Sequence, residues 1–125
     1  MIDSNHRYLS IVLLLTGVAF IGLYFAGVMF PDAWWWEPRQ PEYEQMLMGV
    51  YATLGVFAIL AARAPTKHLS LIWFIAVSNI VHGGIMLFQA VGDPMDQANL
   101  MGDVPALIIV GIAIAILTPM RLESD

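Results

Sequence analysis

The sequence predicts an all-α integral membrane protein, a bundle of four transmembrane helices. Hydrophobic residues make up 59% of the 125-residue chain and charged residues only 12%, and the mean hydropathy is +0.74. So few charges cannot cover a water-facing surface. Four apolar segments are long enough, or nearly long enough, for a hydrocarbon core that takes about 20 helical residues to cross. We therefore expect one transmembrane domain over residues 1–125.

The apolar segments place the helices at about 9–29, 45–62, 69–91 and 98–118. The first exceeds the apolar core of a signal peptide, about 7–15 residues, and no A-x-A cleavage site follows it, so we expect it to remain as an anchor. The fourth is too short to cross if it begins after Pro105, but it spans if it begins near Gln97. We favour the longer helix, because Pro105 then lies in its first turns, where a missing N–H is not needed.

The basic residues predict which way the helices run. Four lie on one side of the expected membrane and one on the other: Arg7, Arg63, Lys67 and Arg121 against Arg39. Basic residues concentrate in cytoplasmic loops. We therefore expect a multi-pass protein of the bacterial inner membrane with both termini in the cytoplasm and the 30–44 and 92–99 connections outside it.

A tryptophan-rich segment, Trp34, Trp35 and Trp36, lies in the first external connection between Pro31 and Pro38. Indole rings prefer the headgroup level of a bilayer, so an aromatic belt is one interpretation. The other is that the three side chains anchor a partner subunit.

Polar side chains form a stripe on the third expected helix. Ser78, His82, Met86 and Gln89 are spaced by four, four and three residues, which places them on one helix face. An ionisable residue inside a span is a candidate functional residue because its burial in hydrocarbon costs free energy. Glu44 and Asp103 begin their own helices at the same outer level. The predicted intramembrane cluster is Glu44, Ser78, His82, Gln89 and Asp103.

Three interpretations of this cluster remain open. It can be a hydrogen-bonded network that fixes helix packing, with no cofactor. It can hold a divalent metal, or copper(I) with Met46, Met48 and Met86. Finally, His82, followed by Gly83 and Gly84, can be an axial ligand to a haem or chlorin.

Several classes of function are excluded. The chain has no cysteine and a formal net charge of −5, so thiolate metal sites are absent and a nucleic acid is not an expected partner. No H-E-x-x-H, Walker or G-x-G-x-x-G motif occurs. We therefore do not expect an enzyme.

Several stretches resemble the small four-helix bacterial membrane proteins of the BphX-like group, whose function is unknown. They are 43–55, 65–72, Val81-His82, Gln89-Ala90 and the string Gly102-Asp103-Val104-Pro105-Ala106-Leu107. The resemblance covers roughly residues 40–118. It implies that Glu44, His68, His82, Gln89 and Asp103 are the family's polar positions. The sequence departs from the pattern at Asn99, since members of the group often carry a histidine a few residues before the Gly-Asp pair. Some relatives are encoded near aromatic-degradation genes, which implies a role beside a membrane oxidation or uptake system.

These features favour a non-catalytic accessory subunit of a larger inner-membrane complex of photosynthetic, respiratory or monooxygenase type. Its expected partners are membrane lipid and larger integral membrane subunits. A small-molecule, pigment, haem or metal-binding membrane protein that uses His82 is the alternative, and an oligomeric transporter or channel is the third hypothesis.

Overall fold

The computed structural model of the protein describes residues 4–33 and 40–120, which contain four α-helices, three 3-10 helices and no strand. The order along the chain is α1 (Ser4–Met29), η1 (Pro31–Ala33), α2 (Pro41–Arg63), η2 (Pro65–Lys67), α3 (Leu69–Gly92), η3 (Pro94–Met101) and α4 (Asp103–Leu117). The all-α prediction is confirmed.

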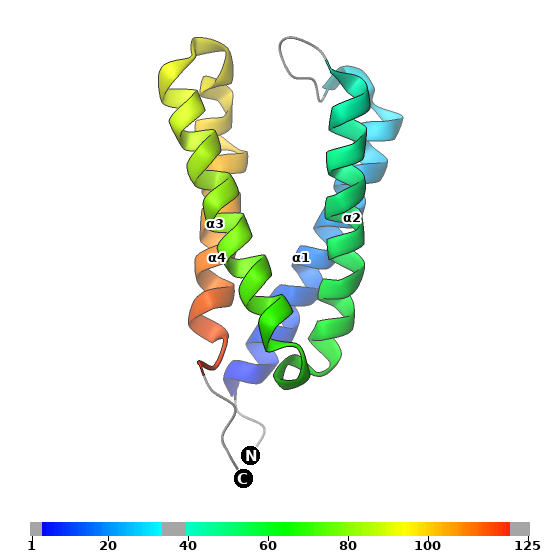
Figure 1. Ribbon diagram of the computed structural model, residues 1–125, viewed down its shortest axis with the longest axis vertical. Helices are drawn as coiled ribbons and strands as arrows, with labels where there is room; N and C mark the ends of the chain where they lie inside the picture. Colours follow the sequence, from blue (N-terminus) through cyan, green and yellow to red (C-terminus); the bar gives the residue numbers. More distant parts are fainter. Residues whose placement is uncertain (1–3, 34–39, 121–125) are drawn as a thin grey trace.

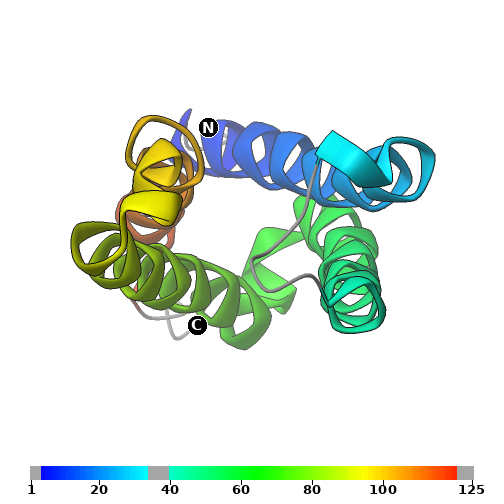
Figure 2. The same cartoon turned by 90° about the horizontal axis from the view of Figure 1, so that it is seen from above.

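The helices form two antiparallel hairpins, α1 with α2 and α3 with α4 (Figure 1). The hairpins converge where η2 connects them and diverge toward the opposite end, which gives the molecule the outline of a V. We call the first the η2 end; the beginning of α1 and the end of α4 also lie there. The opposite end, with η1 and η3, is the open end. Seen from above, the diverging helices occupy four separate corners (Figure 2).

Glycines let the helices of each hairpin approach closely. A Cβ atom added at Gly17 of α1 would lie 2.5 Å from the carbonyl oxygen of Gly55 in α2, and one added at Gly111 of α4 would lie 2.7 Å from the carbonyl oxygen of Ala76 in α3. Small residues at such crossings bring two backbones together, which is a main source of helix association in membranes. Each hairpin therefore has its own close crossing.

One apolar core joins the two hairpins, and it lies toward the η2 end. All four helices contribute side chains that are fully buried: Leu9, Leu13, Ala58, Ala61, Ile72, Ile75, Ala76 and Ile114. Beyond this core most of α2 and α3 is exposed or only partly buried. The packing between hairpins is thus concentrated in one half of the molecule.

Three helices, α1, α2 and α3, are long and apolar enough to cross a membrane, and η3 with α4 makes a fourth if the bent pair counts as one span. This agrees with the prediction of a multi-pass membrane protein. The first two helices begin earlier than expected, at Ser4 and Pro41.

The fourth helix requires a correction. The continuous helix expected over 98–118 is divided into η3 and α4, which meet at Gly102 with a bend of 43°. Pro105 has no N–H to donate to the carbonyl of Met101, and its ring crowds that carbonyl, so α-helical bonding cannot run through this point. The α-helical part therefore begins at Asp103 and has 15 residues.

Candidate functional site

The two hairpins meet through a polar contact beyond the apolar core. The Tyr51 hydroxyl of α2 and Nδ1 of His82 in α3 form a hydrogen bond, and the two ring centroids lie 5.4 Å apart. Phe20 of α1 packs edge-on against Tyr51, with ring centroids 5.0 Å apart. Three helices from both hairpins therefore meet at this pair.

The position of the pair follows from helix geometry. Tyr51 is twelve residues before the end of α2, and His82 is thirteen residues after the start of α3. At about 1.5 Å per residue, both side chains lie some 18–20 Å from the η2 end. Because α2 and α3 run in opposite directions from the same turn, these nearly equal counts bring the two residues to about the same level.

The bond to Tyr51 occupies one ring nitrogen of His82. Among the residues that the structure describes, Nε2 has no hydrogen-bond partner. The carboxylate of Asp103, at the start of α4, is close enough for its charge to act on the imidazole. His82 thus has one fixed nitrogen and one that remains available to a further group.

Asn79 lies one turn below His82 on α3, at the upper edge of the core. It is 1% exposed, and neither its amide nitrogen nor its amide oxygen has a hydrogen-bond partner among the described residues. A buried amide without a partner costs about 1–3 kcal/mol. Among the described side chains, Asn79 is thus the one with buried polar atoms that lack a hydrogen-bond partner.

Two other members of the predicted cluster, Ser78 and Gln89, form no hydrogen bond with His82. Ser78 donates its hydroxyl hydrogen to the carbonyl of Ile75 on its own helix, at 3.2 Å. Gln89 is exposed near the end of α3, and Asp103 is exposed in the first turn of α4, where a negative charge is favoured by the helix dipole.

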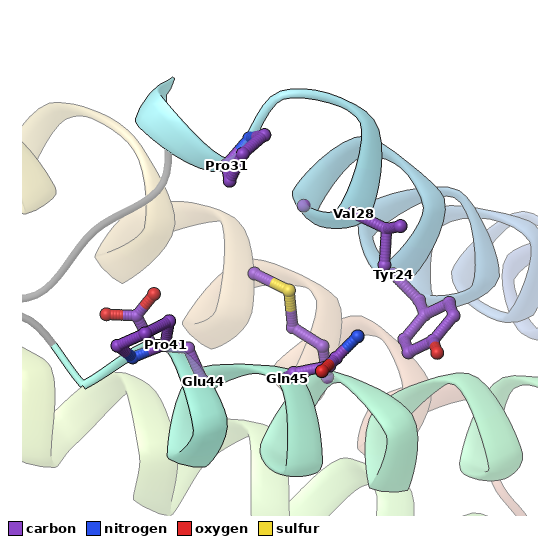
Figure 3. Close-up of a pocket in the computed structure, with 8 residues that line it drawn as sticks. Tyr24, Val28, Pro31, Pro41, Glu44 and Gln45 are labelled. Atoms are coloured by element: carbon purple, nitrogen blue, oxygen red, sulfur yellow. The ribbon is translucent and has the colours of Figure 1, made fainter.

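Glu44 lies in a different part of the structure from His82. It is 8% exposed and lines a pocket of about 170 Å³ between the open ends of α1 and α2. Figure 3 shows Tyr24 and Val28 projecting from α1 towards Glu44 and Gln45 on α2. Met48 completes this wall. Glu44 therefore faces α1, whereas His82 faces Tyr51.

The structure also bears on the ligand sets considered above. No group of three or more His, Asp or Glu side chains that could hold a metal ion occurs within residues 4–33 and 40–120. His68 is exposed immediately before α3. Trp34, Trp35 and Trp36, the candidate partner contacts, lie outside the described residues.

Sequence reasoning missed Tyr51 as a site residue and treated Asn79 only as a neighbour of the stripe. A signal for Tyr51 exists: Glu44, Met48, Tyr51 and Gly55 are spaced by four, three and four residues, so they share one face of α2. The carboxylate shows that this face is not purely apolar. A tyrosine buried on it needs a hydrogen-bond partner for its hydroxyl.

The chain belongs to a family of unknown function, DUF6632, which it matches over residues 3–121. This match does not name the BphX-like group that the sequence resembles. No curated protein and no solved structure matches the chain.

Proposed function

We propose that this DUF6632 member is a non-catalytic accessory subunit of a larger complex in the bacterial inner membrane. The observation that supports this best is the uneven packing of the two hairpins. They share a core near the η2 end and diverge beyond it. Within residues 4–33 and 40–120, no helix lies between these diverging halves, and a transmembrane helix of another subunit would pack there.

The exposed surface of the open end suits contact with another helix. On α3, Phe88 is 83% exposed, and Gly84 has no atom within 4 Å of the point where a Cβ would lie. On α1, Gly22 is equally uncovered. Helices in membranes associate through close van der Waals packing at small residues and through a few polar groups. The uncovered glycines and the exposed Phe88 allow this close van der Waals packing.

The orientation is part of the proposal. We place the η2 end in the cytoplasm, because Arg7, Arg63 and Lys67 all lie there. The open end then faces the periplasm together with Trp34, Trp35 and Trp36, which we propose dock on the partner at the membrane surface. The partner complex is one of photosynthetic, respiratory or monooxygenase type.

The test is purification from native membranes in a mild detergent by a C-terminal tag, combined with photo-crosslinking. A photoreactive amino acid at position 88 is compared with one at position 15, since Leu15 is also exposed but lies toward the η2 end. We expect stoichiometric larger integral membrane proteins and a protein crosslink from position 88 that is absent from position 15. A folded monomer with only lipid adducts at both positions would contradict the proposal.

The second candidate function is binding of a pigment, haem or metal through His82. The free Nε2 of His82 and the unpartnered amide of Asn79 favour it. This function predicts a visible absorption band or a bound metal that is lost in His82→Ala and kept in His68→Ala, which removes an exposed histidine. A colourless, metal-free protein that still copurifies with its complex would contradict this second function, and the accessory role would remain as the proposal.

A further inference from the structure

A groove at the η2 end gathers positive charge from two helices. It has a volume of about 790 Å³ and lies between the beginning of α1 and the end of α2. Arg7 of α1 and Arg63 of α2 line it, and so does Pro65 of η2. Two guanidinium groups from different helices therefore face one space.

Neither arginine is neutralised by a described side chain. Within residues 4–33 and 40–120, neither Arg7 nor Arg63 forms an ion pair or a hydrogen bond through its side chain. Every acidic residue in these ranges lies at the open end of the molecule: Asp32, Glu42, Glu44, Asp93, Asp96 and Asp103. A guanidinium is always charged and has five N–H donors in a fork that matches a phosphate. Among the described side chains, the two arginines of the groove thus have no acidic partner.

Further hydrogen-bond donors lie beside the two charges. His6 and the hydroxyl-bearing residues Ser4, Tyr8 and Ser10 also line the groove. Hydroxyl groups can donate to the oxygens of a phosphodiester that the guanidinium groups do not reach. The lining is therefore suited to an anion with several oxygens rather than to a single chloride.

An apolar path leads from the groove toward the membrane interior. Ile11 lines the groove one turn after Arg7, and Leu14 continues the same face of α1. On α2, Leu60 lies one turn before Arg63; all three apolar side chains are exposed. A ligand that fills both parts must carry a phosphate at one end and hydrocarbon at the other, as a phospholipid does.

We propose that this groove is a binding site for an anionic phospholipid such as phosphatidylglycerol. Arg7 and Arg63 hold the phosphate, the neighbouring hydroxyl groups donate to its free oxygens, and the acyl chains lie along Ile11, Leu14 and Leu60. Basic pockets between transmembrane helices on the cytoplasmic side are suited to anionic headgroups. This site is separate from the open end and does not depend on a partner subunit.

The test measures lipid binding to the tagged full chain in a nonionic detergent by native mass spectrometry. We expect retained phosphatidylglycerol in the unaltered protein and much less phosphatidylcholine at equal concentration. Arg7→Gln and Arg63→Gln should each weaken phosphatidylglycerol binding by about fivefold, and the double variant by more than about tenfold. Both side chains are exposed, so the variants should fold, which circular dichroism and size-exclusion chromatography verify.

Lys67→Gln is the matched control, because Lys67 is a basic, exposed residue of η2 that does not line the groove. It should retain phosphatidylglycerol binding to within about twofold. Equal losses in Lys67→Gln and the arginine variants would overturn the site in favour of general surface charge. Competition by soluble glycerol phosphate at the same concentration as the lipid would also overturn it, because the apolar path would then contribute nothing.

Discussion

At the η2 end, all four helices contribute fully buried leucine, isoleucine and alanine side chains to one core, whereas at the open end the described helices diverge into two hairpins. The open end carries every acidic side chain that the structure describes. The Tyr51 and His82 pair lies between these two regions. The contacts between the hairpins are therefore concentrated in the apolar half, and under our proposal the open end is the part that binds a partner.

The largest expected effect comes from a cavity in the apolar half. Leu13→Ala removes a fully buried side chain of the core and should lower the free energy of unfolding by about 2–5 kcal/mol. Unfolding in increasing fractions of a denaturing detergent, followed by circular dichroism, measures this loss. Leu47→Ala at the open end, where the side chain is 38% exposed, should cost less than half as much. Equal losses would mean that the two regions are packed alike.

The next effect concerns the crossing within the first hairpin. Gly17→Ala places a methyl group against the backbone of Gly55, so α1 and α2 must separate. We expect a loss of about 1–3 kcal/mol in the same unfolding assay. Gly22→Ala is the control on the same helix, because nothing lies within 4 Å of its Cβ position; it should be neutral. A tolerated Gly17→Ala would show that the crossing is looser than the structure indicates.

Asn79 tests the boundary between the two regions. Asn79→Leu replaces an unpartnered buried amide by an apolar group of similar size, so the isolated protein should gain about 1 kcal/mol in stability. If a partner subunit or ligand uses the amide, the same variant should copurify less of it from native membranes. A less stable purified variant would show that the amide is satisfied within the chain.

The smallest effect is expected from the polar contact itself. Tyr51→Phe removes the hydroxyl that bonds to His82 but keeps the ring against Phe20. Hydrogen bonds between membrane helices contribute about 0.6 kcal/mol on average, so the loss should be of this order in the unfolding assay. Tyr43→Phe, at an exposed tyrosine of α2, is the control and should have no effect.

The transmembrane segments were predictable because the length of an apolar segment can be read directly from the sequence. It does not depend on how the helices pair. The break at Gly102 was also present in the sequence, since Pro105 removes the donor that a continuous helix needs. A continuous fourth helix was predicted because the length needed to cross the membrane was given more weight than the missing N–H of Pro105. The α-helical part is shorter as a result, and its start at Asp103 depends on the proline.

For the candidate site, only the position of each residue along its helix was predictable from the sequence. Counting residues along each helix places Glu44 and His82 beyond the core, but it does not show which neighbour each helix face contacts. Glu44 faces α1 and His82 faces Tyr51, a difference that depends on how the hairpins cross. Tyr51 was missed because an aromatic residue within an apolar helix resembles an ordinary core residue.

The short α4 has a consequence for the surrounding lipid. Its 15 residues extend over about 22 Å, whereas the 24 residues of α3 extend over about 36 Å. A bilayer core of about 30 Å is therefore thicker than one helix of this hairpin and thinner than the other. If α4 crosses alone, the membrane becomes thinner on its side, whereas η3 supplies the missing length if the bent pair crosses as one span. This hydrophobic mismatch would favour placing the protein in thin regions of the membrane or beside a neighbour that covers η3.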